Sequence, residues 1–183
     1  MSHKISIESH SEELSGDDLF AGLDHFKRVY RIAKELGENV DFDDAILHAA
    51  CFMHDIVKSE QNHETESANH AREFLKTINF LPEKIEMVAE AIESHHLKRK
   101  PESNEAKLLY DANLIDYLGV IGVCRVTLAS REWFGASDMS TVMEYMAQFK
   151  NKSDTLILPG SRRYAKDKLM LMNLIIKHMK REL

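Results

Sequence analysis

The dipeptide His54-Asp55 places an imidazole next to a carboxylate at the end of an otherwise apolar stretch. Burying two such polar groups without partners would cost about 1–3 kcal/mol each, so the sequence must provide for them. One solution is to bind a divalent cation, because histidine supplies a neutral nitrogen and aspartate supplies charge. A hydrogen bond at a helix end is the ordinary alternative. Adjacent helix positions point about 100° apart, so the other ligands of a cation would have to come from elsewhere in the chain.

Further candidate ligands are spaced along the chain as if each came from a different helix. They are His25, His63, His95 and Asp111. Taken singly, each histidine could equally be a packed residue or the polar end of a helix. The ordered set is far more specific than any of its members, and it predicts a metal site assembled from several helices.

The segments that must position these residues have the apolar spacing of helices. We expect helices over about 19–36, 43–56, 68–78, 82–96, 105–118, 140–150 and 162–181. Pro82 suits the first turn of the fourth helix, where a missing N–H costs nothing. The fifth helix could continue past Gly119 and Gly122, which we expect to allow close backbone packing.

The composition agrees with a helical chain. The 183 residues include only 7 glycines and 3 prolines, too few to form the many tight turns of an all-β sandwich or barrel. No internal repeat or linker divides the sequence. It therefore predicts an all-α fold in a single domain, residues 1–183, with a motif-bearing core over about 19–130 and C-terminal helices at 139–183 packing on it.

Charge and cysteine content limit the partners. A net charge of −6 argues against a nucleic-acid polymer, although a local basic pocket could still bind a small anion. Two cysteines do not make a disulfide framework, and no run of about 18 apolar residues occurs. We expect a soluble, cytoplasmic protein with no membrane partner. The broad apolar face of segment 162–181 is expected to be core, with the interface of a homodimer as the alternative.

The ordered set resembles the HD-domain superfamily of metal-dependent phosphohydrolases, in its compact bacterial nucleotide-hydrolase-like branch. The resemblance covers about Leu23 to Arg125. The matching residues are Asp24-His25, Arg28-Val29, Ala49 to Ile56, His63, Ser67-Ala68, Ile92, His95 and Asp111 to Asp116, followed by Gly119, Gly122 and Arg125. It implies an all-α helical bundle around a central divalent metal ion, which could be Mn, Mg, Fe, Co, Ni or Zn.

The resemblance implies that His25, His54 and Asp55 hold this ion with a carboxylate from the fifth helix. Relatives usually carry a further aspartate where this chain has Asn113. We expect Asp111 to be the fourth ligand, because a hard cation favours a charged oxygen. The amide oxygen of Asn113 is the alternative.

The activity that the resemblance implies is hydrolysis of a phosphoester or phosphoanhydride by a metal-activated water, on a small phosphorylated substrate such as a nucleotide. His63 and His95 would activate water or protonate the leaving group, and Asp116 would support a ligand. Lys58 and Arg125 are candidate phosphate-binding residues. Two alternatives remain: a non-catalytic HD-fold sensor or binding module, and a di-iron oxygenase on the same bundle.

Overall fold

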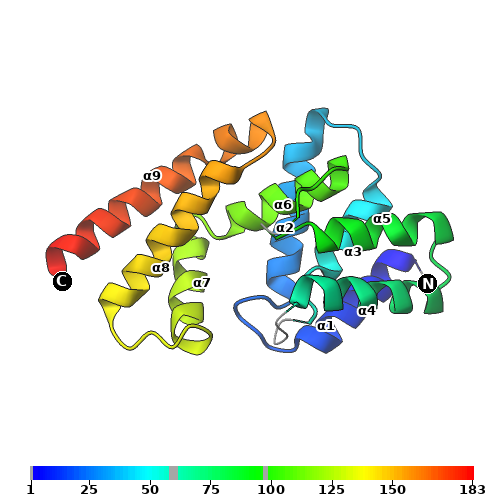
Figure 1. Cartoon of the computed structure of the whole chain (residues 1–183), viewed down its shortest axis with the longest axis horizontal. Coiled ribbons are helices and arrows are strands. Elements are labelled where there is room, and N and C mark those ends of the chain that lie inside the picture. The colour runs from blue at the N-terminus through cyan, green and yellow to red at the C-terminus, as the bar shows by residue number, and fades with distance from the viewer. Residues whose placement is uncertain (1, 58–61, 97–98) are drawn as a thin grey trace. The chain divides into compact units, whose positions relative to one another are not determined.

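The computed structural model describes residues 2–57, 62–96 and 99–183, which form nine α-helices, two short 3-10 helices and no strand (Figure 1). This confirms the predicted all-α class. The chain divides into two compact units, residues 1–112 and 113–183, with the boundary inside one helix.

The first unit holds the candidate ligands and is built around one central helix. Its helices are α1 His3–Ser15, α2 Leu23–Leu36, α3 Asp44–Met53, α4 His63–Thr77, α5 Pro82–Glu93 and most of α6 Asn104–Asp116, with the short 3-10 helix Gly37–Asn39 after α2. Every residue of α3 from Ile46 to Met53 is buried. This helix packs against α1, α2 and α5, and α4 lies alongside α5 (Figure 1). Because neighbouring helices surround α3, the residues after its last turn lie in the interior.

The start of α3 is held by Asp43. Its Oδ1 accepts hydrogen bonds from the backbone N–H groups of Ala45 and Ile46, at 2.9 and 3.2 Å, as an N-cap residue does. Its own backbone N–H donates to Glu105 Oε1 at 2.6 Å, which joins the starts of α3 and α6. These two contacts fix the N-terminus of α3. The helix then runs to Met53, and His54 is its C-cap residue.

The start of α2 differs from the prediction. The helix begins at Leu23 rather than at position 19, and Leu19 is 78% exposed. The reason is the turn before it, in which Asp18 Oδ1 accepts hydrogen bonds from the N–H groups of Phe20 and Ala21. Asp18 therefore stabilises a turn instead of capping the helix. His25 consequently lies in the first turn of α2 rather than in its middle.

Helix α1 was not predicted from the sequence. Ile7 and Ser11 are its buried residues, so it lacks the repeated apolar positions that mark a helix. Polar contacts hold it instead. Lys4 Nζ lies 2.6 Å from Asp44 Oδ2, and Glu8 Oε1 lies 2.9 Å from His48 Nε2.

The second unit contains α7 Gly119–Glu132, α8 Met139–Lys152 and α9 Pro159–Glu182, which pack against one another, and the short 3-10 helix Ser153–Thr155. The expected continuation of the fifth helix through Gly119 is wrong. α6 ends at Asp116, and α7 begins at Gly119, whose φ of 76° lies outside the range that one continuous helix would need there. A Cβ on Gly122 would lie 2.2 Å from the carbonyl oxygen of Tyr117, which confirms close backbone packing at this glycine.

Among the described helices, none is by itself both long and apolar enough to cross a membrane. Only α6 and α7 taken together, which are separated by a bend, reach that length and composition.

Candidate metal centre

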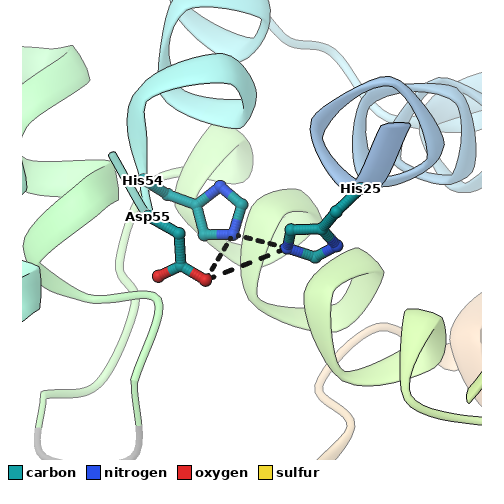
Figure 2. Close-up of side chains that lie close together, drawn as sticks. All are labelled: His25, His54 and Asp55. Atoms are coloured by element: carbon teal, nitrogen blue, oxygen red, sulfur yellow. Dashed lines mark hydrogen bonds and ion pairs between the residues drawn. The ribbon is translucent and has the colours of Figure 1, made fainter. Parts of the chain in front are cut away.

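Three predicted ligands meet at the end of α3. His54 and Asp55 follow the last turn of that helix, and His25 reaches them from the first turn of α2 (Figure 2). His25 Nε2 lies 3.2 Å from His54 Nε2, and Asp55 Oδ2 lies 3.9 Å from the first nitrogen and 3.5 Å from the second. All three residues are buried. One atom from each is therefore available to a single cation.

The orientation of His54 is set by the backbone. Its Nδ1 donates a hydrogen bond to the carbonyl oxygen of Cys51 at 3.0 Å, and because a carbonyl only accepts, Nδ1 carries the proton. The lone pair of Nε2 then faces His25 and Asp55. Burial lowers the pKa of His54 to about 3 despite the opposing charge of Asp55. A neutral imidazole with Nε2 unprotonated is the form that binds metal ions.

A second pair of histidines faces the other oxygen of Asp55. His95 Nε2 lies 3.4 Å and His63 Nε2 lies 3.8 Å from Asp55 Oδ1. His95 is fixed in the same way as His54, because its Nδ1 donates to the carbonyl oxygen of Ile92 at 2.5 Å. The residues Asp55, His63 and His95 form another group that could hold a cation. Asp55 is common to both groups and offers one oxygen to each.

Charge and burial oppose each other around Asp55. Burial by itself would raise the pKa of the Asp55 carboxyl, but the adjacent His54, His95 and His25 outweigh it and hold that pKa well below its usual range. Burial would likewise lower the pKa of His95, but the hydrogen bond and charge of Asp55 raise it. Asp55 is thus an ionised carboxylate in the interior, the form in which it would bind a cation. The donor set fits a divalent metal ion.

The other predicted site residues have different surroundings. Asp111 is fully buried on α6, and among the described residues it belongs to neither histidine-aspartate group, so its place as fourth ligand stays a prediction. Asn113, Asp116 and Arg125 are buried residues of the second unit. Arg125 Nη1 donates to Asp116 Oδ2 at 2.7 Å. Lys58 lies outside the described residues.

Sequence reasoning missed Glu64, a buried carboxylate beside His63. Its Oε2 lies 3.3 Å from His63 Nδ1. The residue is acidic in the first turn of α4, where such residues are usually explained by the helix dipole. Its position directly after a candidate ligand was the one available signal.

A model of the HD domain family matches residues 22–118, which is more than half of the chain. The chain belongs to the HD domain family. Among curated relatives, an uncharacterised protein of Clostridium beijerinckii is 33% identical over 103 residues, which are 52% of this chain and 64% of that protein. Ribonuclease Y of Borreliella burgdorferi is 32% identical over 93 residues, which are 51% of this chain but only 18% of that enzyme.

Solved structures show the same HD fold at low identity. A protein of Lactobacillus plantarum has a TM-score of 0.83 at 17% identity, covering 100% of this chain and 98% of that one. Bacillus subtilis YpgQ in complex with ADP has a TM-score of 0.78 at 20% identity, covering 99% and 98%. A predicted HD superfamily hydrolase from an uncultured Thermotogales bacterium has a TM-score of 0.71 at 22% identity, covering 98% and 92%. The chain thus has the fold of HD-superfamily hydrolases, with histidine and aspartate groups that could hold a metal ion.

Proposed function

We propose that this HD-domain chain is a metal-dependent phosphohydrolase that cleaves a small phosphorylated substrate, a nucleotide in particular. The observation that carries the proposal is the meeting of His25, His54 and Asp55 in a buried group with a metal-binding tautomer at His54. Such a group is costly to bury unless a cation or a proton network compensates it.

In this proposal, His25, His54 and Asp55 hold one divalent ion, and Asp111 completes its ligands. Asn113 is the alternative fourth ligand. A divalent ion held there would supply Lewis-acid chemistry, polarising a P–O bond and lowering the pKa of a bound water. The residues Asp55, His63 and His95 form the place for a second ion, and without one the two histidines stay available for proton transfer.

The chain's own residues then have separate tasks in hydrolysis. Water adds across a P–O bond: its oxygen joins the phosphorus, the bond to the leaving oxygen breaks, and a proton passes to that oxygen. His95 and His63, whose Nε2 atoms lie 3.4 and 3.8 Å from Asp55 Oδ1, are proposed to take and return that proton. Lys58 and Arg125 are proposed to bind the phosphate. Asp116 is proposed to support a ligand of the ion, and its carboxylate accepts a hydrogen bond from Arg125.

A nucleotide is the proposed substrate class for two reasons. YpgQ, which shares the fold over nearly the whole chain, was solved with ADP. Ribonuclease Y, a relative over about half of this chain, is by name a ribonuclease. We propose the small nucleotide rather than the polymer because the chain carries a net charge of −6, which opposes a polyanion.

The test is a hydrolysis panel with the full chain. Chelator-treated protein is supplied in turn with Mn²⁺, Mg²⁺, Co²⁺, Fe²⁺, Ni²⁺ or Zn²⁺ and mixed with nucleoside mono-, di- and triphosphates or a short RNA, and released phosphate, pyrophosphate or nucleotide is measured. We expect turnover of a small nucleotide that depends on the added metal. If only the RNA is cleaved, the substrate class is RNA and not a small nucleotide. If the protein binds metal but hydrolyses none of the compounds, it is a non-catalytic HD module. Oxygen-dependent turnover of iron-loaded protein would point to an oxygenase instead.

A further inference from the structure

Glu64 is a buried carboxylate that the first turn of α4 does not need. Its side chain is 7% exposed, whereas Glu66 in the same turn is exposed to solvent. A negative charge near a helix N-terminus is stabilising when solvated, and Glu66 already supplies one. Removing a second carboxylate from water is costly, so the burial of Glu64 calls for positive charge or donors close by.

One group close to Glu64 is His63, the histidine that faces Asp55. Glu64 Oε2 is 3.3 Å from His63 Nδ1, and the opposite nitrogen of that ring, Nε2, is 3.8 Å from Asp55 Oδ1. The imidazole of His63 therefore lies between two carboxylates. Its side chain is 27% exposed, so packing alone does not fix the ring. His54 and His95 have backbone carbonyls that accept a hydrogen bond from Nδ1 and fix their tautomers. At His63 the Oε2 atom of Glu64 lies within ion-pair distance of the same ring nitrogen.

The charge of Glu64 reaches beyond His63. Together with the larger effect of Asp55, it raises the pKa of His95, the other histidine beside Asp55 Oδ1, and so favours positive charge there. Two neutral imidazoles and one carboxylate shared with another group bring little charge to a cation. A buried carboxylate behind the ligands adds charge and makes the imidazole nitrogen a better donor to the metal.

We propose that Glu64 is a positioning residue of the metal centre. It holds the proton of His63 on Nδ1, turns Nε2 toward Asp55, and strengthens cation binding by the group Asp55, His63 and His95. This rests on the proposed function only in taking that group to bind a divalent ion. Glu64 itself does not touch substrate or ion.

The test compares Glu64→Gln and Glu64→Ala with Glu66→Gln, a matched loss of charge from the same helical turn. Chelator-treated full-length chains are titrated with Co²⁺ by calorimetry. In the wild type we expect one ion at His25, His54 and Asp55 and a second, weaker one at the Asp55, His63 and His95 group. Glu64→Gln should lower the affinity for the second ion by about 10–100-fold, and Glu64→Ala should lower it at least as much. Glu66→Gln should leave the affinities for both ions unchanged. Retention of the first ion shows that each variant is folded.

A second readout separates positioning from plain stability. Long-range ¹H–¹⁵N NMR of the metal-free chains reports which nitrogen of His63 is protonated, and we expect Nδ1–H in the wild type and a mixture of tautomers in Glu64→Ala. Unchanged Co²⁺ affinity in Glu64→Gln, an unchanged tautomer in Glu64→Ala, or a wild type that takes up a single ion would each overturn the proposal. Because neither readout uses turnover, the role of Glu64 can stand even if the nucleotide panel fails.

Discussion

His10 and His70, sixty residues apart on α1 and α4, bring their Nε2 atoms to 2.8 Å with ring planes only 15° apart. His25 and His54 have the same ring separation, 5.1 Å, but their Nε2 atoms are 3.2 Å apart and their planes meet at 62°. At equal ring separation, the shorter distance means that the nitrogens of His10 and His70 face each other directly, as an N–H···N hydrogen bond requires. The nitrogens of His25 and His54 also lie within hydrogen-bond distance, but Asp55 Oδ2 lies 3.9 and 3.5 Å from them. Both pairs can form a hydrogen bond, and the second pair also has a carboxylate oxygen close enough for the three residues to hold one cation.

We predict that mild acid weakens the docking of α1. Burial and the charge of His70 lower the pKa of His10 from 6.5 against the opposing charge of Glu13, and burial lowers the pKa of His48 despite its hydrogen bond with Glu8. Around and below pH 6.5 these two histidines therefore bind more protons in the unfolded chain than in the folded one, so their contribution to the free energy of unfolding falls as the pH falls. Urea unfolding of metal-free protein between about pH 7.5 and about pH 5.5 measures this loss.

The matched variants for this prediction are His10→Gln and His178→Gln. His178 is exposed on α9, and its replacement should leave the pH dependence as in the wild type. His10→Gln should reduce the loss between the two pH values, because one of the titrating groups is gone. An equal pH dependence in wild type and His10→Gln would contradict the assignment to the His10 and His70 pair.

Removal of a ligand should release the metal ion. We predict that His54→Ala and Asp55→Ala each abolish metal retention through gel filtration, since His54 presents Nε2 to the group and Asp55 supplies its charge. His178→Ala is the control. Chelation of the wild type should also lower its melting temperature, because an ion that binds only the folded state stabilises it. Full metal content in both ligand variants would refute the site.

The fourth ligand can be tested by exchanging carboxylate and amide. Asp111→Asn should lose metal affinity, because Asp111 is fully buried and a neutral oxygen binds a hard cation more weakly. Asn113→Asp should not raise hydrolysis if the working site is built around Asp111. A large rise in turnover of Asn113→Asp would instead mark the natural chain as a degenerate relative with a weakened site.

How far the sequence predicts this molecule depends on the kind of interaction. Helices α3 and α5 follow from apolar spacing, and the ordered histidines and aspartates predicted that His25, His54 and Asp55 belong together. Helix α1 was not predicted because its contacts are polar pairs such as that of Glu8 with His48, which leave no periodic apolar pattern in the sequence. Glu64 was not predicted as a site residue because its burial depends on how α4 packs. From the sequence alone, an acidic residue at a helix start is explained by the helix dipole.

The last prediction concerns the ion pair of Asp116 and Arg125. Both side chains are nearly fully buried, and the Arg125 guanidinium also lies 4.6 Å from the ring centroid of Tyr117. Losing one member leaves the other charge buried without that partner. Arg125→Met or Asp116→Asn should therefore lower the free energy of unfolding by about 3–5 kcal/mol.

The double variant decides whether the two residues act as a unit. Because it contains no uncompensated charge at this place, it should lose less than the sum of the single losses, and urea unfolding of all four chains measures the coupling. Strict additivity would show that the pair does not stabilise the fold as a unit. If Arg125 also binds phosphate, the milder Arg125→Lys should raise KM for a nucleotide while the protein stays folded, because lysine keeps the charge but not the paired N–H donors.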